Sequence, residues 1–283
     1  MAVSKKSVSK QFDVDKIRAD FPILERKIRG KKLAYLDSAA SAQKPRQVLD
    51  SLLSAYSETY SNVHRGLHFL SETSTDAYED VRNKVARFIG AKSGDEIVLT
   101  AGATMSLNMI ASSWARPRLQ QDDEILISIA DHHANIVPWQ LAAEKTGAKV
   151  RAFDLDLDGS FNMSSFLEKV TKKTRIIAVP HVSNVLGTVF PISDIGEIAS
   201  NVGAKLVVDG CQGAPHLKLD MQDLNCDFYA ISCHKMYGPT GLGVLYGKKK
   251  WLEELPPYQG GGGMINEVKK DRISYGELPN KYE

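Results

Sequence analysis

Cysteine is scarce in this 283-residue sequence, which contains three: Cys211, Cys226 and Cys233. The odd number and the lack of a secretory signal argue against a disulfide framework and favour the reducing environment of the cytoplasm. Cys233 and its neighbour His234 invite a zinc site, but no Cys-x-x-Cys pair accompanies them, so we expect no metal. A run of about eighteen apolar residues is also missing, so we expect no helix that spans a membrane.

The sequence has no excess of charge and no familiar nucleotide-binding motif. Lys and Arg total 36 against 34 acidic residues, so the net charge of +2 gives no electrostatic argument for nucleic acid or an anionic membrane as a partner. The stretch TAGATMSLN lacks the glycine spacing of a Rossmann fingerprint. The stretch GPTGLGVLYGKKK fails the spacing of a Walker motif and leads into a predicted strand instead of a helix.

From about residue 96, short β-rich runs alternate with helical patterns. Several runs are apolar throughout, as in IIAV and LVV, which is typical of strands covered on both faces. The alternation predicts an α/β fold with a mainly parallel seven-stranded sheet. The predicted strands are Glu96–Thr100, Glu124–Ala130, Lys149–Leu155, Arg175–Ser183, Lys205–Asp209, Asp227–Ser232 and Gly243–Tyr246. The predicted helices are Gln43–Tyr60, Thr73–Ile89, Thr104–Ala115, Ile136–Thr146, Ser164–Val170 and Ser193–Asn201, and Gly260–Gly263 is predicted to be a mobile loop.

Polar residues follow five of the predicted strands, where open α/β sheets bind their ligands. Together they supply anion donors, imidazoles, an amide, a carboxylate and an amine. An aldehyde cofactor with a phosphate tail and a pyridine nitrogen requires all of these groups, which favours pyridoxal 5'-phosphate (PLP). The segments are Gly102–Thr104, His132–Asn135, His181–Asn184, Asp209–Gln212 and Ser232–Lys235.

Lys235 and Asp209 are the strongest candidates. Lys235 follows an apolar strand in AISCHKMYGPTGLG, and a partly desolvated amine there can form a Schiff base; the alternative is a solvated surface lysine. Asp209 ends the strand KLVVD, where its carboxylate can pair with a protonated pyridine nitrogen; the alternative is a helix N-cap. Gln212 can reach a ring oxygen.

Two further segments complete the predicted site. His132 and His133 follow the strand EILISIA, and an imidazole there can stack on a pyridine ring and exchange a proton with the substrate. A metal-binding pair is less consistent with the sequence, because no Asp, Glu or Cys at ligand spacing joins them. Gly102–Thr104 precede a helix, so their backbone N–H groups form an anion site for a phosphate or, alternatively, a simple helix start.

Read together, these segments resemble the cysteine desulfurases of the class V aminotransferase superfamily. The likeness is greatest to the Suf-type branch, which overlaps with selenocysteine lyases, and it runs from about residue 12 to the end. The stretches that carry it are LAYLDSAASAQKP, VHRGLHFLS, DHHANIVPW, HVSNVLGT, VVDGCQ, CDFYAISCHKMYGPTGLGVLY and GGGGMI.

The resemblance implies a PLP-dependent transferase of fold type I that acts as a homodimer. It implies transfer of sulfur from L-cysteine to an enzyme cysteine as a persulfide, with release of L-alanine, for iron–sulfur cluster assembly through a sulfur-acceptor protein. It assigns the Schiff base to Lys235 and the stacking and proton transfer to His132. Asp209 and Gln212 would contact the ring; Gly102, Ala103, Thr104, Ser232 and His234 the phosphate; and Asn184, Ala39 and Ala40 the substrate.

The sequence also departs from the family pattern. Ala103 replaces a Thr of the usual phosphate loop, Cys211 replaces an Ala, and Cys233 replaces a Gly or Ser. Family members continue beyond this point, and none of the three cysteines matches their sulfur acceptor. We therefore predict a truncated desulfurase that lacks most of the small domain, with an arm and helix at 1–33, a PLP-binding domain at 34–272 and the start of a C-terminal region at 273–283.

Three readings of the function stay open. The first is a desulfurase-type enzyme, and the second is another class V reaction, either selenocysteine cleavage or transamination. The third is a non-catalytic cofactor-binding remnant, which the substitutions at Ala103, Cys211 and Cys233 mildly favour. The family reading predicts that these residues bind PLP without turning over cysteine, and that Cys211 lies against the cofactor ring, opposite His132, as a poorly reactive thiol.

Overall fold

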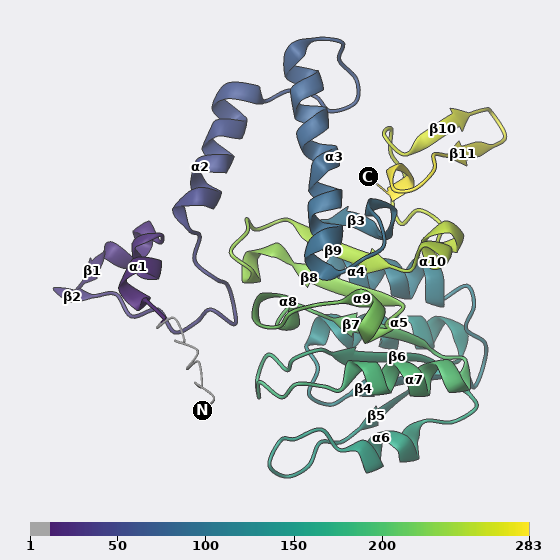
Figure 1. The fold of residues 1–283 in the computed structure, drawn as a ribbon. Coiled ribbons are helices and arrows are strands. Elements are labelled where there is room, and N and C mark those ends of the chain that lie inside the picture. Colours follow the sequence, from purple (N-terminus) through teal and green to yellow (C-terminus); the bar gives the residue numbers. More distant parts are fainter. Residues whose placement is uncertain (1–11, 283) are drawn as a thin grey trace, which may run out of the picture.

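A seven-stranded sheet lies at the centre of the computed structural model, which describes residues 12–282 (Figure 1). Its strands are β3 (Ile97–Thr100), β4 (Glu124–Ser128), β5 (Lys149–Phe153), β6 (Thr174–Pro180), β7 (Lys205–Asp209), β8 (Phe228–Ser232) and β9 (Gly243–Gly247). The order across the sheet is β3-β9-β8-β7-β6-β4-β5, and β9 alone runs in the direction opposite to the other six strands. The predicted α/β fold with a mainly parallel seven-stranded sheet is confirmed, and the glycine-rich stretch that resembles a Walker loop leads into strand β9, as expected.

Helices cover both faces of this sheet (Figure 1). Each of the six predicted helices corresponds to a helix of the structure, although two of them end in π-helical turns at Ala55–Thr59 and Ile110–Ala115. Three short helices after residue 212 were not predicted. Among the described residues, every helix is too short or too polar to cross a lipid bilayer. The α-helices, of which α1 and α2 lie away from the sheet (Figure 1), are α1 (Val14–Ala19), α2 (Arg46–Ser54), α3 (Phe69–Ile89), α4 (Ala103–Met109), α5 (Val137–Thr146), α6 (Met163–Lys169), α7 (Ile192–Val202), α8 (Gly213–His216), α9 (Met221–Leu224) and α10 (Lys249–Glu254).

Alternate residues of the strands enter two separate cores. In β4, Ile125 and Ile127 pack with residues of α4 and α5, whereas Leu126 packs in the opposite core with Phe166 of α6 and Ile195 of α7. All five of these side chains are buried. Because both faces are covered, the strands are apolar at successive positions, which is the pattern that makes them visible in the sequence.

Two element boundaries differ from the predictions for identifiable reasons. Helix α3 was expected to start at Thr73 but starts at Phe69, because the imidazole of His68 accepts a hydrogen bond from the backbone N–H of Ser71 and caps the helix. Strand β6 was expected to reach Ser183 but ends at Pro180. Beyond it the backbone turns, and the N–H of Ser183 donates to the carbonyl of Thr188.

Two small hairpins lie outside the central sheet and were not predicted. One pairs β1 (Lys27–Ile28) with β2 (Lys31–Lys32), and the other pairs β10 (Ile265–Val268) with β11 (Ile273–Tyr275). The domain boundary placed between residues 272 and 273 falls inside the second hairpin. The first part of the predicted arm, residues 1–11, lies outside the described residues.

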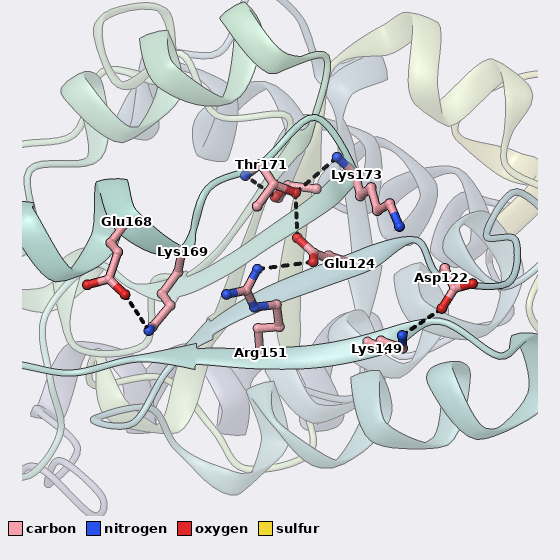
Figure 2. Close-up of polar contacts among 9 residues, drawn as sticks. Asp122, Glu124, Lys149, Arg151, Glu168, Lys169, Thr171 and Lys173 are labelled. Atoms are coloured by element: carbon pink, nitrogen blue, oxygen red, sulfur yellow. Dashed lines mark hydrogen bonds and ion pairs between the residues drawn. The ribbon is translucent and has the colours of Figure 1, made fainter.

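Ion pairs gather at the amino ends of β4 and β5, where the strands begin (Figure 2). Glu124 accepts hydrogen bonds from Arg151 Nη1 at 3.0 Å and from Thr171 Oγ1 at 2.6 Å, and Lys149 pairs with Asp122 at 2.6 Å. The acids and bases here are paired with each other, which fits a structural role. The carboxyl ends of the strands, in contrast, line a pocket.

Candidate active site

A pocket of about 470 Å³ opens at the carboxyl ends of the strands, within the size range of small-molecule sites. The structure brings Lys235, Asp209 and His132 together in it, although His132 and Lys235 are 103 positions apart in the sequence. The other lining residues are Asp37, Ala39, Ala40, Ala103, Thr104, Ala134, Asn184, Cys211, Ser232 and His234.

Lys235 reaches the pocket from a tight turn after the fully buried strand β8. The turn is a single 3₁₀ segment, Cys233–Lys235, closed by hydrogen bonds from the N–H groups of Met236 and Gly238 to the carbonyl of Cys233, at 3.0 and 2.9 Å. Within residues 12–282 the Lys235 side chain makes no hydrogen bond and no ion pair, although it is only partly exposed. An unpaired, half-buried amine in a pocket is available to a ligand.

Asp209 is the buried carboxylate of this pocket. It lies at the end of β7, and its Oδ1 accepts a hydrogen bond from the Cys211 N–H at 2.9 Å. Gln212, which was expected at the cofactor ring, does not line the pocket directly. It is buried, and its Nε2 donates to the carbonyl of Ala39 at 2.6 Å, so it ties the β7 end to the segment that carries Ala39 and Ala40.

His132 lines the pocket, whereas its neighbour His133 does not. The Nδ1 atom of His132 accepts from the Ala134 N–H at 3.1 Å, so the neutral ring carries its proton on Nε2. The residue before it, Asp131, accepts hydrogen bonds from His132 N–H and Asn135 Nδ2, at 2.8 and 2.7 Å. Burial and the nearby charge of Asp209 raise the pKa of Asp131 well above its usual value.

The sequence did not single out Asp131, although it lies inside the quoted stretch DHHANIVPW. Its role is visible only through its partners: Asn135, which is fully buried, accepts a hydrogen bond from the indole Nε1 of Trp139 at 3.0 Å and donates to Asp131. This buried chain of contacts fixes the backbone from which His132 projects. Asp37 of the pocket lining was missed as well, because it follows no predicted strand.

The start of α4 forms the opposite end of the pocket. Gly102 has φ of 143°, a conformation that other residues rarely adopt, and it leads into Ala103 and Thr104. The Ala103 N–H donates to Ser232 Oγ at 2.9 Å, so the β8 end and the helix start are joined. A Cβ on Gly243 would lie 2.4 Å from Gly102 Cα, so the absence of a side chain at Gly243 lets β9 approach this turn.

His234 and Asn184 also reach the pocket. The Nδ1 atom of His234 lies 3.2 Å from Ser41 Oγ in a hydrogen bond, and desolvation, with the charges of Lys235 and Lys44, lowers its pKa. Asn184 follows the bend after β6 and is partly exposed.

None of the three cysteines is an exposed thiol. Burial raises the pKa of Cys226 to about 12 and that of Cys233 to about 11. Burial and the charge of Asp209 raise the pKa of Cys211, which lines the pocket. All three thiols are therefore protonated near neutral pH and are weak nucleophiles.

Two stretches that carried the resemblance do not meet the pocket of Lys235. The stretches VHRGLHFLS and GGGGMI meet each other instead, and Val63, His64, Arg65, Gly262 and Gly263 line a second pocket of about 510 Å³. The sequence alone could not distinguish these two groups of stretches.

Comparison with known proteins gives consistent results. The aminotransferase class-V family model matches residues 34–283. The chain is 50% identical to a probable cysteine desulfurase of Synechocystis over 267 residues, which is 94% of this chain and 64% of that protein. It is 46% identical to a cysteine desulfurase of Salmonella newport over 96% of this chain and 67% of that protein. The chain thus spans about two thirds of the length of these relatives.

Solved structures show the same likeness. The cysteine desulfurase CsdA of Escherichia coli superposes with a TM-score of 0.86 at 42% identity, over 96% of this chain and 67% of that one. The apo cysteine desulfurase of Thermococcus onnurineus superposes with a TM-score of 0.89 at 36% identity, over 95% of this chain and 66% of that one.

Proposed function

Because this chain belongs to the class-V aminotransferase family, we propose that its pocket binds pyridoxal 5'-phosphate and that the protein acts as a cysteine desulfurase. One observation carries the proposal: Lys235, an amine without a hydrogen-bonding partner among residues 12–282, and Asp209, a buried carboxylate, line the same pocket. These two groups are the covalent and ionic anchors that a pyridine aldehyde requires.

The residues present fit this cofactor. When bound, PLP supplies an electron sink for charge that develops at the α-carbon of an amino acid. Lys235 would bind the aldehyde carbon, and Asp209 would keep the pyridine nitrogen protonated. His132 would stack on the ring, and its Nε2–H is the group left to exchange a proton, because Nδ1 already accepts from Ala134.

The phosphate and the substrate would occupy opposite ends of the pocket. The start of α4 offers the Thr104 hydroxyl and backbone N–H groups, and Ser232 and His234 complete the phosphate end. Because Ser232 Oγ already accepts from Ala103, the hydroxyl proton is the group that Ser232 would offer to a phosphate oxygen. Asn184 and the backbone of Ala39 and Ala40 would bind the substrate carboxylate, with Gln212 supporting Ala39.

The proposed reaction moves sulfur from L-cysteine to a thiol as a persulfide and releases L-alanine, for iron–sulfur cluster assembly. The relatives named as cysteine desulfurases support this choice over transamination. The acceptor is not Cys211, Cys226 or Cys233, because each is buried or half-buried and has a raised pKa. Three cysteines, none of them in a disulfide, are also compatible with the proposed cytoplasmic location.

Cofactor binding is tested by an absorbance spectrum of the purified protein with added PLP. We expect a visible band, and borohydride reduction should remove this band and fix the cofactor covalently on Lys235. The Lys235→Ala variant should lack the band, and Lys172→Ala, which changes an exposed lysine, should keep it. A band that survives in Lys235→Ala with unchanged intensity would show that another amine binds the cofactor.

Turnover is tested by alanine and sulfide release from L-cysteine under reducing conditions. For these 283 residues we expect PLP binding without persulfide formation on the three cysteines. A persulfide that forms on Cys211, Cys226 or Cys233 and depends on Lys235 would contradict the acceptor assignment. Alanine release from L-selenocysteine but not from L-cysteine would favour selenocysteine cleavage instead.

A further inference from the structure

The carbonyl oxygen of His234, which belongs to the peptide bond that leads into Lys235, accepts an unusual number of donors. The Ala42 N–H donates to it at 3.0 Å, Lys44 Nζ at 3.2 Å and Ser41 Oγ at 3.4 Å. All three donors come from one segment about 190 residues earlier in the chain. We call residues 37–44 the strap.

The strap is also held by hydrogen bonds from residues outside it. The Ala39 carbonyl accepts from Gln212 Nε2 at 2.6 Å, and the Ser41 carbonyl accepts from the hydroxyl of Tyr35 at 2.7 Å. Ala42 is buried, and the hydroxyl of Ser41 also bonds the ring of His234. The strap thus connects the β7 end to the turn that carries Lys235, and its residues Asp37, Ala39 and Ala40 form one wall of the pocket.

Lys44 is the only charged donor among these contacts. Its ammonium donates to the carbonyls of Ala42 and His234, and within residues 12–282 it forms no ion pair. Other lysines near the sheet do have acidic partners, such as Lys149 with Asp122 and Lys249 with Asp95. Hydrogen bonds from a charged donor are stronger than those between neutral groups, so Lys44 is the strongest single link between the strap and the turn. Desolvation lowers its pKa.

We propose that Lys44 is a positioning residue for Lys235: its ammonium binds the His234 carbonyl and thereby fixes the Cys233–Lys235 turn, which aims the Lys235 amine into the pocket. This inference rests on the proposed function only in its second part, which is the effect of Lys44 on the affinity for PLP. The geometric part concerns the turn itself and can be measured without any cofactor.

The first measurement is amide hydrogen exchange in the cofactor-free protein. The N–H groups of Met236 and Gly238 are protected by the Cys233 carbonyl. In Lys44→Met we expect both to exchange roughly tenfold faster, because the lost bond to a charged group contributes about that factor in local stability. Lys44→Arg retains a charged donor and should exchange as the parent does.

The matched control is Lys248→Met. Lys248, like Lys44, is partly buried, and its Nζ bonds to the backbone carbonyl and side chain of Asn225 and pairs with Asp227, away from the pocket. It should lower the melting temperature without speeding exchange at Met236 and Gly238. Equal protection of these amides in Lys44→Met and the parent protein would overturn the proposal.

The second measurement is the affinity for PLP, followed by the visible band. Lys44→Met should raise the apparent Kd about tenfold or more and change the pH midpoint of the band, whereas Lys44→Arg and Lys248→Met should change neither. A parent protein without any Lys235-dependent band would contradict the proposed function and leave the exchange result to decide the role of Lys44. A Lys44→Met variant with faster exchange but unchanged Kd and band would limit Lys44 to a structural contact and overturn its role toward Lys235.

Discussion

Next to Asp209, outside the pocket lining, lies a buried pair of side chains: His181, whose backbone N–H donates to the Asp209 carbonyl at 2.9 Å, and Tyr229. His181 Nδ1 and the Tyr229 hydroxyl are hydrogen-bonded at 2.8 Å, and their rings meet edge to face. A Cβ on Gly210 would lie 1.8 Å from the Tyr229 ring, and a Cβ on Gly213 would lie 2.6 Å from His181 Nδ1. The pair therefore fills the space under the turn from Asp209 to Gly213 and determines where the turn can lie.

This pair predicts a pH dependence of stability. Burial lowers the pKa of His181 from 6.5 to about 4, so the unfolded chain binds more protons than the folded one between these values. The contribution of His181 to the free energy of unfolding is fully present above pH 6.5. It is lost as the pH falls toward 4, by about 3 kcal/mol in all. Urea unfolding measured across this range should show the loss.

The variants separate this effect from other titrating groups. His181→Gln should be less stable at neutral pH but should lose less stability between pH 6.5 and 4 than the parent. Tyr229→Phe keeps the buried imidazole, so it should keep the pH dependence while being less stable throughout. If the free energy of unfolding of His181→Gln and of the parent protein changed in parallel with pH, then the pKa of His181 would be the same in the folded and unfolded states. That result would refute the assignment.

Among the elements, close backbone packing between β9 and the start of α4 shapes the end of the pocket where we propose that the phosphate binds. A Cβ on Gly243 would lie 2.4 Å from Gly102 Cα and 2.7 Å from its N and C atoms, all of them backbone atoms that no side-chain rotation can move. Gly243→Ala should therefore destabilise the protein by about 1–3 kcal/mol, the usual effect of overpacking, and weaken PLP binding more than any change in melting temperature explains. Thermal unfolding and the visible band measure the two effects.

Gly260→Ala is the matched control, because a Cβ there would meet nothing within 4 Å. It should leave both the melting temperature and the PLP affinity unchanged. If Gly243→Ala bound PLP as tightly as the parent, the Gly102 turn would not be part of the phosphate end.

The sequence predicted best those elements whose buried positions appear as a pattern of apolar residues. Strands such as β6 and β7 are apolar at successive positions because both faces are covered, so their existence and most of their bounds could be read directly. The hairpins β1–β2 and β10–β11 were missed because their short strands are mostly exposed and charged. The π-helical turns leave no mark in the apolar spacing, so they were missed as well.

The same distinction applies to the site. Lys235, Asp209 and His132 follow apolar strands, so the strand pattern itself brought them to notice. Lys44, Asp131 and His181 act through partners that only the folded chain brings near: Lys44 contacts a carbonyl 190 residues away, and His181 pairs with a residue 48 positions later. Residues of this kind could not be predicted from spacing along the chain.

At the scale of the whole molecule, α2 and the part of α3 nearest to it extend away from the sheet (Figure 1). Large apolar side chains are exposed along them: Leu53 is 68% exposed, Tyr56 72% and Phe69 75%. Helix α3 contacts the π-helical turn that continues α2, so these residues belong to one region of the surface. Exposed apolar surface of this extent is unusual for a monomer and is typical of a protein interface.

We therefore expect this surface to mediate self-association, which agrees with the homodimer that the family resemblance implies. In a twofold dimer the same patch contacts itself, so one substitution places a charge on both sides of the interface. Leu53→Glu should shift the sedimentation coefficient from that of a dimer toward that of a monomer at micromolar concentration. Leu157→Glu is the control, because Leu157 is also exposed but lies in the loop after β5, which is the edge strand opposite β3 and lies away from α2 (Figure 1). If Leu157→Glu dissociated the protein as well, or if the parent protein sedimented as a monomer, then α2 would not be the site of self-association. A Leu53→Glu monomer that still shows the Lys235-dependent band would further establish that one chain supplies the anchors for the cofactor, as the pocket geometry indicates.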